Sequence, residues 1–185
     1  MAGGKKGCLI FVVIAGVLIL LVYLLVYPSI QTSRSQMMAL HEEVTAAWSH
    51  LDETFQRRAD LIPNLVETVK LYAPHEQEVF GALTQSQLKF TTRMSLPSKI
   101  AANNELTAAL DRLSATAHRY PDLMTDQTFI LLQEKLAEVE DRIAEGRAEY
   151  NGAVREYNAS LRGFPADITA GAFGFTKMPL LEAPQ

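Results

Sequence analysis

Apolar residues recur every three or four positions along most of the chain after residue 30. In the first stretch they share this step at six positions: Met37, Leu40, Val44, Trp48, Leu51 and Phe55. Such a step places the apolar side chains on one face of an α-helix. The pattern therefore predicts a first helix over about residues 31–58, with Trp48 as a buried side chain.

A second helix is expected from residue 60 to about residue 90. Pro74 follows Ala73 inside this stretch, and proline disfavours the helical conformation at the residue before it. We therefore expect a kink or a short break at Pro74, after which the apolar stripe resumes at Val79 and Phe80.

Two more helices complete the pattern. The third is expected over about residues 98–119, and the fourth from a cap at Thr125 or Asp126 to about residue 161, with charged residues on its far face. No segment in these stretches alternates between apolar and polar residues as a strand would. The predicted fold class is all-α, an antiparallel up-and-down four-helix bundle with long helices.

The join between the first two helices is expected to be a corner built from capping residues. Arg57 and Arg58 would lie in the last turn of the first helix, where cations suit the helix dipole. Asp60 would cap the second helix, and Pro63 would fall in its first turn, where the missing N–H costs nothing. Asn64 would follow Pro63 in the same turn.

The run from Cys8 to Tyr27 holds 20 residues without a charge, Pro, Asn or Gln. As a helix it would span about 30 Å, the hydrocarbon thickness of a bilayer. A cleaved signal peptide is the alternative, but its apolar region is normally shorter and ends at a small-residue cleavage site, whereas this run exits through "VYPSIQT". The chain is therefore divided into a short tail (1–7), a transmembrane anchor (8–27), a helical bundle (28–163) and an apolar C-terminal tail (164–185).

The orientation of the anchor is inferred from the flanking cations. Lys5 and Lys6 precede the run, and only Arg34 follows it within 15 residues. Positive charge favours the cytoplasmic side. This predicts a single-pass protein of the bacterial inner membrane, with a cytoplasmic N-terminus and a periplasmic or extracellular bundle.

The charge of the remaining chain excludes one class of partner. Residues 28–185 contain all 21 acidic residues and every basic residue except Lys5 and Lys6, so their formal charge is −6. This balance argues against nucleic acid as a partner. The one cysteine, Cys8, lies in the anchor, so the bundle contains no disulfide and must be held by packing.

The common catalytic and metal-binding motifs are missing from the sequence. "HEQEV" at His75 would need a histidine at position 79 to form a zinc-protease motif, but Val79 is there. No histidine has a glutamate three residues before it, as a di-iron bundle requires. We predict no catalytic, cofactor-binding or metal-binding residue. The alternative is a polar pocket in which the corner residues join His75 and Glu76.

Two Tyr-Asn pairs lie seven residues apart in the last helix: Tyr150-Asn151 and Tyr157-Asn158. Seven residues are two helical turns, so the pairs share one face. They could line a groove, but we favour the interpretation that they brace the bundle through buried hydrogen bonds.

The tail "FPADITAGAFGF" keeps large apolar side chains in a segment with one charge, among them Phe164, Phe173 and Phe175. Exposed apolar clusters of this kind usually mark contact sites. The tail lacks the Lys and Arg fringe of an interfacial segment, so we expect it to pack on protein, its own chain or a neighbouring copy, rather than on lipid.

Several segments, in their order and spacing, resemble the LemA family: the N-terminal anchor, "AAWSHLDETFQRRADLIPNLVETVKLYAPHE", "RYPDL", "FILLQEKLAEVEDRIAEGRAEYNGAVREYNASLRGFP" and a closing "FGF". The resemblance implies a membrane-anchored four-helix bundle without an established catalytic function. One related branch is tied to the building of magnetosome membranes, which makes membrane organisation an expectation by analogy. Pro74 and the glycine-bearing "TAGAFGF" depart from the family pattern, and Pro74 puts a continuous second helix in doubt.

Three functions are weighed. The first is an assembly, scaffold or membrane-organising protein without catalysis, with membrane lipid as a partner through residues 8–27 and a homo-oligomer or a membrane protein as a further partner. The second is a ligand-binding or sensory bundle, which usually has a second membrane span and an inside output domain. The third is an enzyme with an unrecognised polar pocket. The missing catalytic set, the long charged helix and the apolar tail favour the first.

Overall fold

The chain is all-helical in the computed structural model, which describes the backbone of residues 3–91, 95–163 and 166–181. Side chains are described at residues 14, 16, 17, 20, 21, 23 and 24 and over residues 27–90, 95–163 and 166–181. The elements are α1 (Gly3–Tyr72), α2 (Gln77–Leu88), the 3-10 turn η1 (Lys89–Thr91), α3 (Leu96–Ala117), α4 (Pro121–Met124), α5 (Gln127–Ser160) and α6 (Ala166–Thr169). No strand occurs in the described backbone, as the predicted fold class requires.

The chain divides into two compact units, and each is described by itself. The terminal unit comprises Met1–Thr45 and Gly152–Leu180, and the bundle unit comprises Ala46–Asn151 and Leu181–Gln185. Both α1 and α5 contribute to each unit.

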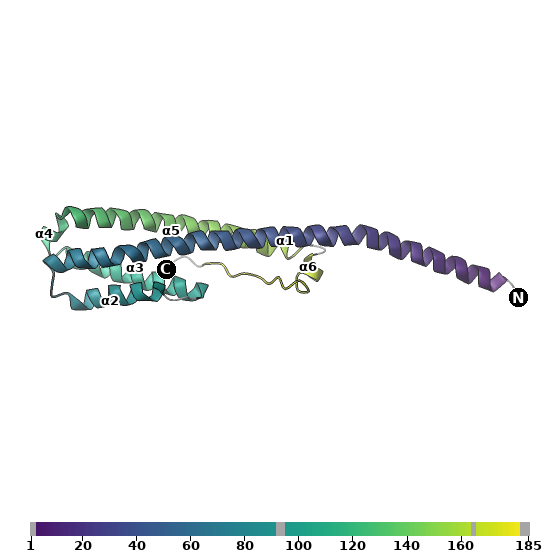
Figure 1. The fold of residues 1–185 in the computed structure, drawn as a ribbon, viewed down its shortest axis with the longest axis horizontal. Coiled ribbons are helices and arrows are strands. Elements are labelled where there is room, and N and C mark those ends of the chain that lie inside the picture. Colours follow the sequence, from purple (N-terminus) through teal and green to yellow (C-terminus); the bar gives the residue numbers. More distant parts are fainter. Residues whose placement is uncertain (1–2, 92–94, 164–165, 182–185) are drawn as a thin grey trace. The chain divides into compact units, whose positions relative to one another are not determined.

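In the bundle unit, the second part of α1, then α2, α3 and the first part of α5 run alternately in opposite directions (Figure 1). The side chains that fill its core include several that are almost fully buried: Leu51, Phe55, Leu83, Leu106, Phe129 and Ile143. Trp48 is only half-buried, although its ring meets Phe55 edge-on at 6.4 Å between centroids. The expectation of a fully buried Trp48 was wrong, and Phe55 occupies the core position.

The predicted corner at residues 57–64 is wrong, because α1 continues through Asp60 and Pro63 without a break. The apolar face stays in phase across this stretch, with buried side chains at Ala59, Ile62, Val66 and Val69. A proline in a helix interior removes one hydrogen bond and crowds the carbonyl of the residue four before it. That local cost is offset because the same helix buries a continuous apolar face on both sides of Pro63.

The residues assigned to the corner have other roles. Arg57 pairs with Glu53 one turn earlier, at 2.6 Å. Asp60 caps nothing and accepts a hydrogen bond from Gln56 at 2.9 Å. The Asn64 carbonyl accepts a hydrogen bond from the Thr68 hydroxyl at 2.9 Å. These contacts are local to one helix, so none of them turns the chain.

The chain turns at Pro74, where a break was predicted. α1 ends at Tyr72, and the turn closes through a hydrogen bond from Glu76 N–H to the Ala73 carbonyl at 3.3 Å. Glu76 also accepts from the Tyr120 hydroxyl at 2.8 Å and from Arg119 at 3.1 Å. The turn is thus tied to the connection between α3 and α4.

The last helix begins as predicted at Asp126, whose carboxylate accepts the Phe129 N–H at 2.8 Å. The Tyr72 hydroxyl donates to the other oxygen of this carboxylate at 2.8 Å. The Phe129 N–H and then the Tyr72 hydroxyl lower the pKa of Asp126. The cap therefore joins the start of α5 to the end of α1.

The predicted boundary at residue 28 is not a helix end, because α1 runs through Pro28. Within the described part of the chain, no helix is long and apolar enough to cross a membrane. Most side chains of the predicted anchor, residues 8–27, lie outside those described. The large apolar side chains described in this stretch are exposed: Ile14, Val17, Leu20, Leu21, Tyr23, Leu24 and Tyr27.

Candidate functional site

The C-terminal segment is held in the terminal unit by the side chain of Asn158 on α5. The Asn158 amide donates to the Met178 carbonyl at 2.8 Å, and its oxygen accepts the Met178 N–H at 2.9 Å. One side chain thus satisfies both backbone groups of one residue, as a neighbouring strand would. Tyr157, next to it, donates its hydroxyl to the Thr176 carbonyl at 3.0 Å.

Asn151 makes the equivalent pair inside the bundle unit. Its amide donates to the Leu181 carbonyl at 3.0 Å, and its oxygen accepts the Leu181 N–H at 2.8 Å. Leu181 is buried. The backbone of the C-terminal segment therefore has partners even though it forms neither helix nor strand.

Rings and a cation hold other parts of the tail in the terminal unit. His41 meets Tyr157 edge-on at 5.6 Å and Phe175 at 6.4 Å between ring centroids. The guanidinium of Arg34 lies 5.1 Å from the centre of the Phe173 ring. Such an arrangement is a cation–π contact.

The two Tyr-Asn pairs were expected to brace the bundle by hydrogen bonds, and their asparagines do form such bonds, but with the C-terminal segment. Tyr150 is buried and its ring lies 6.2 Å from Trp48, and burial raises its pKa. The asparagines grip the C-terminal segment rather than another helix. The described tail packs on its own chain, while Phe164 lies outside the described residues. The heptad spacing was visible in the sequence, but nothing there named the segment that it binds.

Arg58, assigned to the corner, is instead a buried charge in the bundle unit. Its Nη1 donates to Asn103 at 3.0 Å and to Thr107 at 2.9 Å, both on α3. The same nitrogen lies 2.8 Å from a carboxylate oxygen of Glu140 on α5. Burial lowers the pKa of Arg58, and Glu140 opposes that shift. Asn103, Thr107 and Glu140 come from distant helices, so no spacing along the sequence points to their pairing with Arg58.

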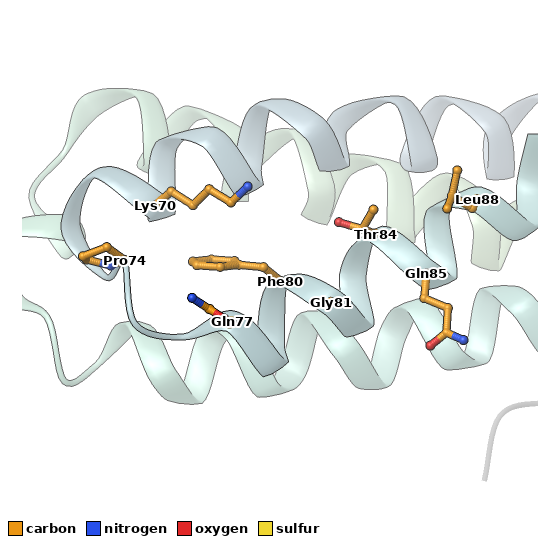
Figure 2. A pocket seen from close by; sticks show the side chains of 8 residues that line it. All are labelled: Lys70, Pro74, Gln77, Phe80, Gly81, Thr84, Gln85 and Leu88. Carbon is orange, nitrogen blue, oxygen red and sulfur yellow. The ribbon is translucent and has the colours of Figure 1, made fainter.

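A hollow of about 660 Å³ lies between the end of α1 and α2 (Figure 2). Phe80 is buried at its base, and the Lys70 ammonium lies 5.6 Å from the centre of that ring. A side chain added at Gly81 would meet nothing within 4 Å, so this side of α2 is open. The exposed Leu88 lines the same hollow.

A second hollow of about 750 Å³ lies between α1 and α5 at the same end of the bundle unit. Leu71 and Leu131 line it, and Leu71 is 80% exposed. Apolar side chains exposed beside such hollows are typical of surfaces that contact other proteins.

Metal chemistry finds no support in the described residues, because no group of three or more His, Cys, Asp or Glu side chains in them could hold an ion. His75 and Glu76 do not join the former corner residues. Glu76 pairs with Arg119 and Tyr120, and Arg58 pairs with α3 and α5. The polar pocket weighed at the corner is therefore not formed.

Comparison with curated proteins finds three magnetosome proteins among the relatives of this chain. Magnetosome protein MamQ 2 and Magnetosome protein MamQ 1 of Paramagnetospirillum magneticum are each 25% identical in an alignment of 166 residues that covers 76% of this chain and 61% of theirs. Magnetosome protein MamQ of Magnetospirillum gryphiswaldense is 23% identical over 167 residues, with the same shares covered. The chain thus spans about three fifths of the length of these relatives.

A family model supplies the broader placement. The model of the LemA family matches residues 47–185. This range contains the bundle unit from residue 47 onward, together with Asn151 and Asn158, which bind the C-terminal segment. Because this match covers most of the sequence, the chain belongs to the LemA family.

Proposed function

We propose that this chain is a single-pass membrane protein whose helical bundle acts in assembly or membrane organisation without catalysis. The observation that carries the proposal is the apolar run of residues 8–27, in which every large apolar side chain described is exposed. Exposed leucine, valine and tyrosine side chains along a helix are stable in lipid and costly in water. The magnetosome proteins among the relatives support a membrane setting.

The proposed orientation keeps Lys5 and Lys6 in the cytoplasm and the bundle outside the inner membrane. The expected partners are lipid around residues 8–27 and a second copy or another membrane protein at the bundle. The exposed Leu71 and Leu131 beside a hollow support a protein contact at that end of the bundle unit.

Membrane insertion is tested by replacing Leu20 and Leu24 with arginine in the full-length protein. An arginine at the bilayer centre costs about 3 kcal/mol on insertion scales, so the double variant should leave the carbonate-resistant membrane fraction. The matched control places arginine at Gln31 and Gln36, outside the run. Retention of the double variant in the membrane would contradict the anchor.

Assembly is tested separately by native mass measurement of the detergent-extracted protein. An oligomer or a stable complex with another membrane protein is expected. A strict monomer at every concentration would contradict the assembly role while leaving the anchor intact. Leu71→Ser should weaken the complex, and Met38→Ser, at an exposed position on the terminal unit, serves as the matched control.

A ligand-binding bundle is the second candidate. One observation favours it, a cleft between α3 and α5 with Arg58 at its base.

A further inference from the structure

The cleft between α3 and α5 consists of two hollows in the bundle unit. One, of about 240 Å³, is lined mainly by polar residues: Asn103, Asn104, Thr107, Ala108, Asp111, Glu140 and Arg147. The other, of about 330 Å³, includes Arg58, Asp111 and several leucines in its lining. Asp111 lines both, so the two hollows adjoin at this residue. The second is at the lower end of the range of volumes for small-molecule sites, and the first is below it.

The buried side chain of Arg58 has hydrogen-bonding capacity that its contacts within the protein do not use. Its side chain is only 5% exposed, yet its Nε finds no hydrogen-bond partner among the described residues. A buried donor without a partner costs about 1–3 kcal/mol. Apolar side chains of similar volume would often stabilise a core better than a buried ion pair does. A buried donor without a partner, on a residue that lines a hollow, therefore points to a ligand.

Two further groups in the cleft have unused capacity. Arg147 holds Asn104 through Nη2 at 3.4 Å, but its buried Nε has no partner within the described chain. Glu140 approaches Arg58 at 2.8 Å, but the geometry is not that of a hydrogen bond, so its buried oxygen accepts none from a described group. The cleft thus offers both donors and an acceptor.

The charges of the cleft select the class of ligand. Arg58 and Arg147 are positive, and Asp111 and Glu140 are negative, so the four formal charges cancel. An anion would meet the two carboxylates, and a cation would meet the two guanidinium groups. A zwitterion can pair with both signs, because its carboxylate accepts from guanidinium groups and its ammonium donates to carboxylates.

The lining of the second hollow indicates what kind of side chain the ligand carries. Its apolar lining comes from all three helices around the cleft: Leu65, Leu110, Leu113, Leu136 and Ala137. An aliphatic group buried there would gain about 0.8 kcal/mol per CH₂.

We propose that this cleft binds a free α-amino acid with an aliphatic side chain. Its carboxylate accepts hydrogen bonds from Arg58 and Arg147, its ammonium group donates to Glu140 and Asp111, and its side chain enters the leucine-lined hollow. The site lies wholly in the bundle unit and does not depend on the proposed membrane role.

L-Leucine is the probe, titrated into the detergent-solubilised full-length protein by calorimetry and by thermal unfolding. Saturable heat and a rise in the unfolding temperature are expected. Isocaproate lacks the ammonium group, isoamylamine lacks the carboxylate and glycine lacks the side chain. Each should bind at least about tenfold more weakly, the effect of about 1.4 kcal/mol.

Two substitutions at the partly exposed rim test the charges without emptying the core. Asp111→Asn and Arg147→Gln should each weaken leucine binding about tenfold or more, with the unfolding temperature of the free protein nearly unchanged. Arg112→Gln and Asp141→Asn are matched controls, since both residues are exposed and line neither hollow. The controls should bind as the original protein does.

Three results would overturn the proposal. The first is no heat and no thermal shift with leucine in a protein that unfolds cooperatively. The second is equal binding of isocaproate, which would show an anion site. The third is unchanged leucine affinity in both rim variants, which would place binding elsewhere.

Discussion

Pro63 and Pro74 lie eleven residues apart on the same stretch of sequence, yet one lies inside a helix and the other ends it. Around Pro63 the buried face continues, with Ile62 and Val66 both within the core. After Pro74 the apolar stripe lapses, and Phe80 is the next buried side chain. A proline therefore ends a helix here only where tertiary burial no longer supports the next turn.

The polar partners of the two stretches differ in the same way. Asp60 bonds one turn back within α1. Glu76 reaches a different connection through Tyr120 and Arg119. Asp60 thus pairs only within its own helix, whereas Glu76 ties the turn at Pro74 to another connection of the chain.

The largest expected effect comes from removing the burial that carries α1 past Pro63. Ile62→Ala should lower the free energy of unfolding by about 2–5 kcal/mol, because it leaves a cavity in a closed core. Urea unfolding followed by circular dichroism measures it. The exposed Leu71→Ala is the matched control and should change stability little. If Ile62→Ala and Leu71→Ala lowered the free energy of unfolding equally, burial would not explain why α1 continues past Pro63.

The prolines themselves should respond with opposite signs. Pro63→Ala restores a helix hydrogen bond worth up to about 3 kcal/mol, less about 1 kcal/mol because proline restricts the unfolded chain, so stability should rise by about 2 kcal/mol. Pro74→Ala loses only the unfolded-state benefit and should lower stability by about 0.4–1 kcal/mol. If both substitutions raised the free energy of unfolding, then Pro74 itself, and not the loss of burial after it, would be what ends the helix.

The polar tie at the Pro74 turn should have a smaller effect than the core. Glu76→Ala removes the acceptor for Tyr120 and Arg119 and should lower the unfolding temperature by less than Ile62→Ala does. Glu78→Ala, two residues further on and exposed, is the control. Hydrogen exchange at residues 73–76 should accelerate in the first variant only. Unchanged exchange there would mean that the turn does not need the tie.

The smallest effect concerns the two aspartates considered as caps. Asp60→Ala should change the free energy of unfolding by less than about 0.5 kcal/mol, as at other surface sites. Asp126→Ala should lower the unfolding temperature, because Asp126 caps α5. Thermal unfolding of both variants at neutral pH decides this. A larger loss of stability in Asp60→Ala than in Asp126→Ala would favour the predicted helix cap at Asp60, against the continuous α1 of the structure.

Asp126 also predicts a pH dependence with a definite sign. Its pKa is lowered in the folded protein, so its contribution is present above its ordinary pKa of 3.8 and is lost as pH falls through the lower folded value. Asp126→Asn keeps an acceptor oxygen but removes this titration. The unfolding temperature of the variant should therefore fall less steeply in acid than that of the original protein. If the unfolding temperatures of both proteins fell equally steeply in acid, Asp126 would not be the source of this pH dependence.

Much of the fold followed from the sequence because helices carry their own period. The apolar step predicted the extent of α5, and the local chemistry of capping and proline predicted its cap at Asp126 and the break at Pro74. The corner at residues 57–64 was wrong because each residue there was assigned a local role. The same period continued through Asp60 and Pro63, and it was the stronger signal because burial of a long face outweighs one lost hydrogen bond.

The sequence by itself determined helix type, apolar faces and the heptad spacing of Asn151 and Asn158, since these depend on neighbours within a few turns. Only the tertiary structure decided what those side chains meet. The asparagines bind Met178 and Leu181, and Arg58 meets groups 45 or more residues away. The physical reason is that hydrogen bonds and ion pairs act over about 3–4 Å in space, whatever the separation along the chain.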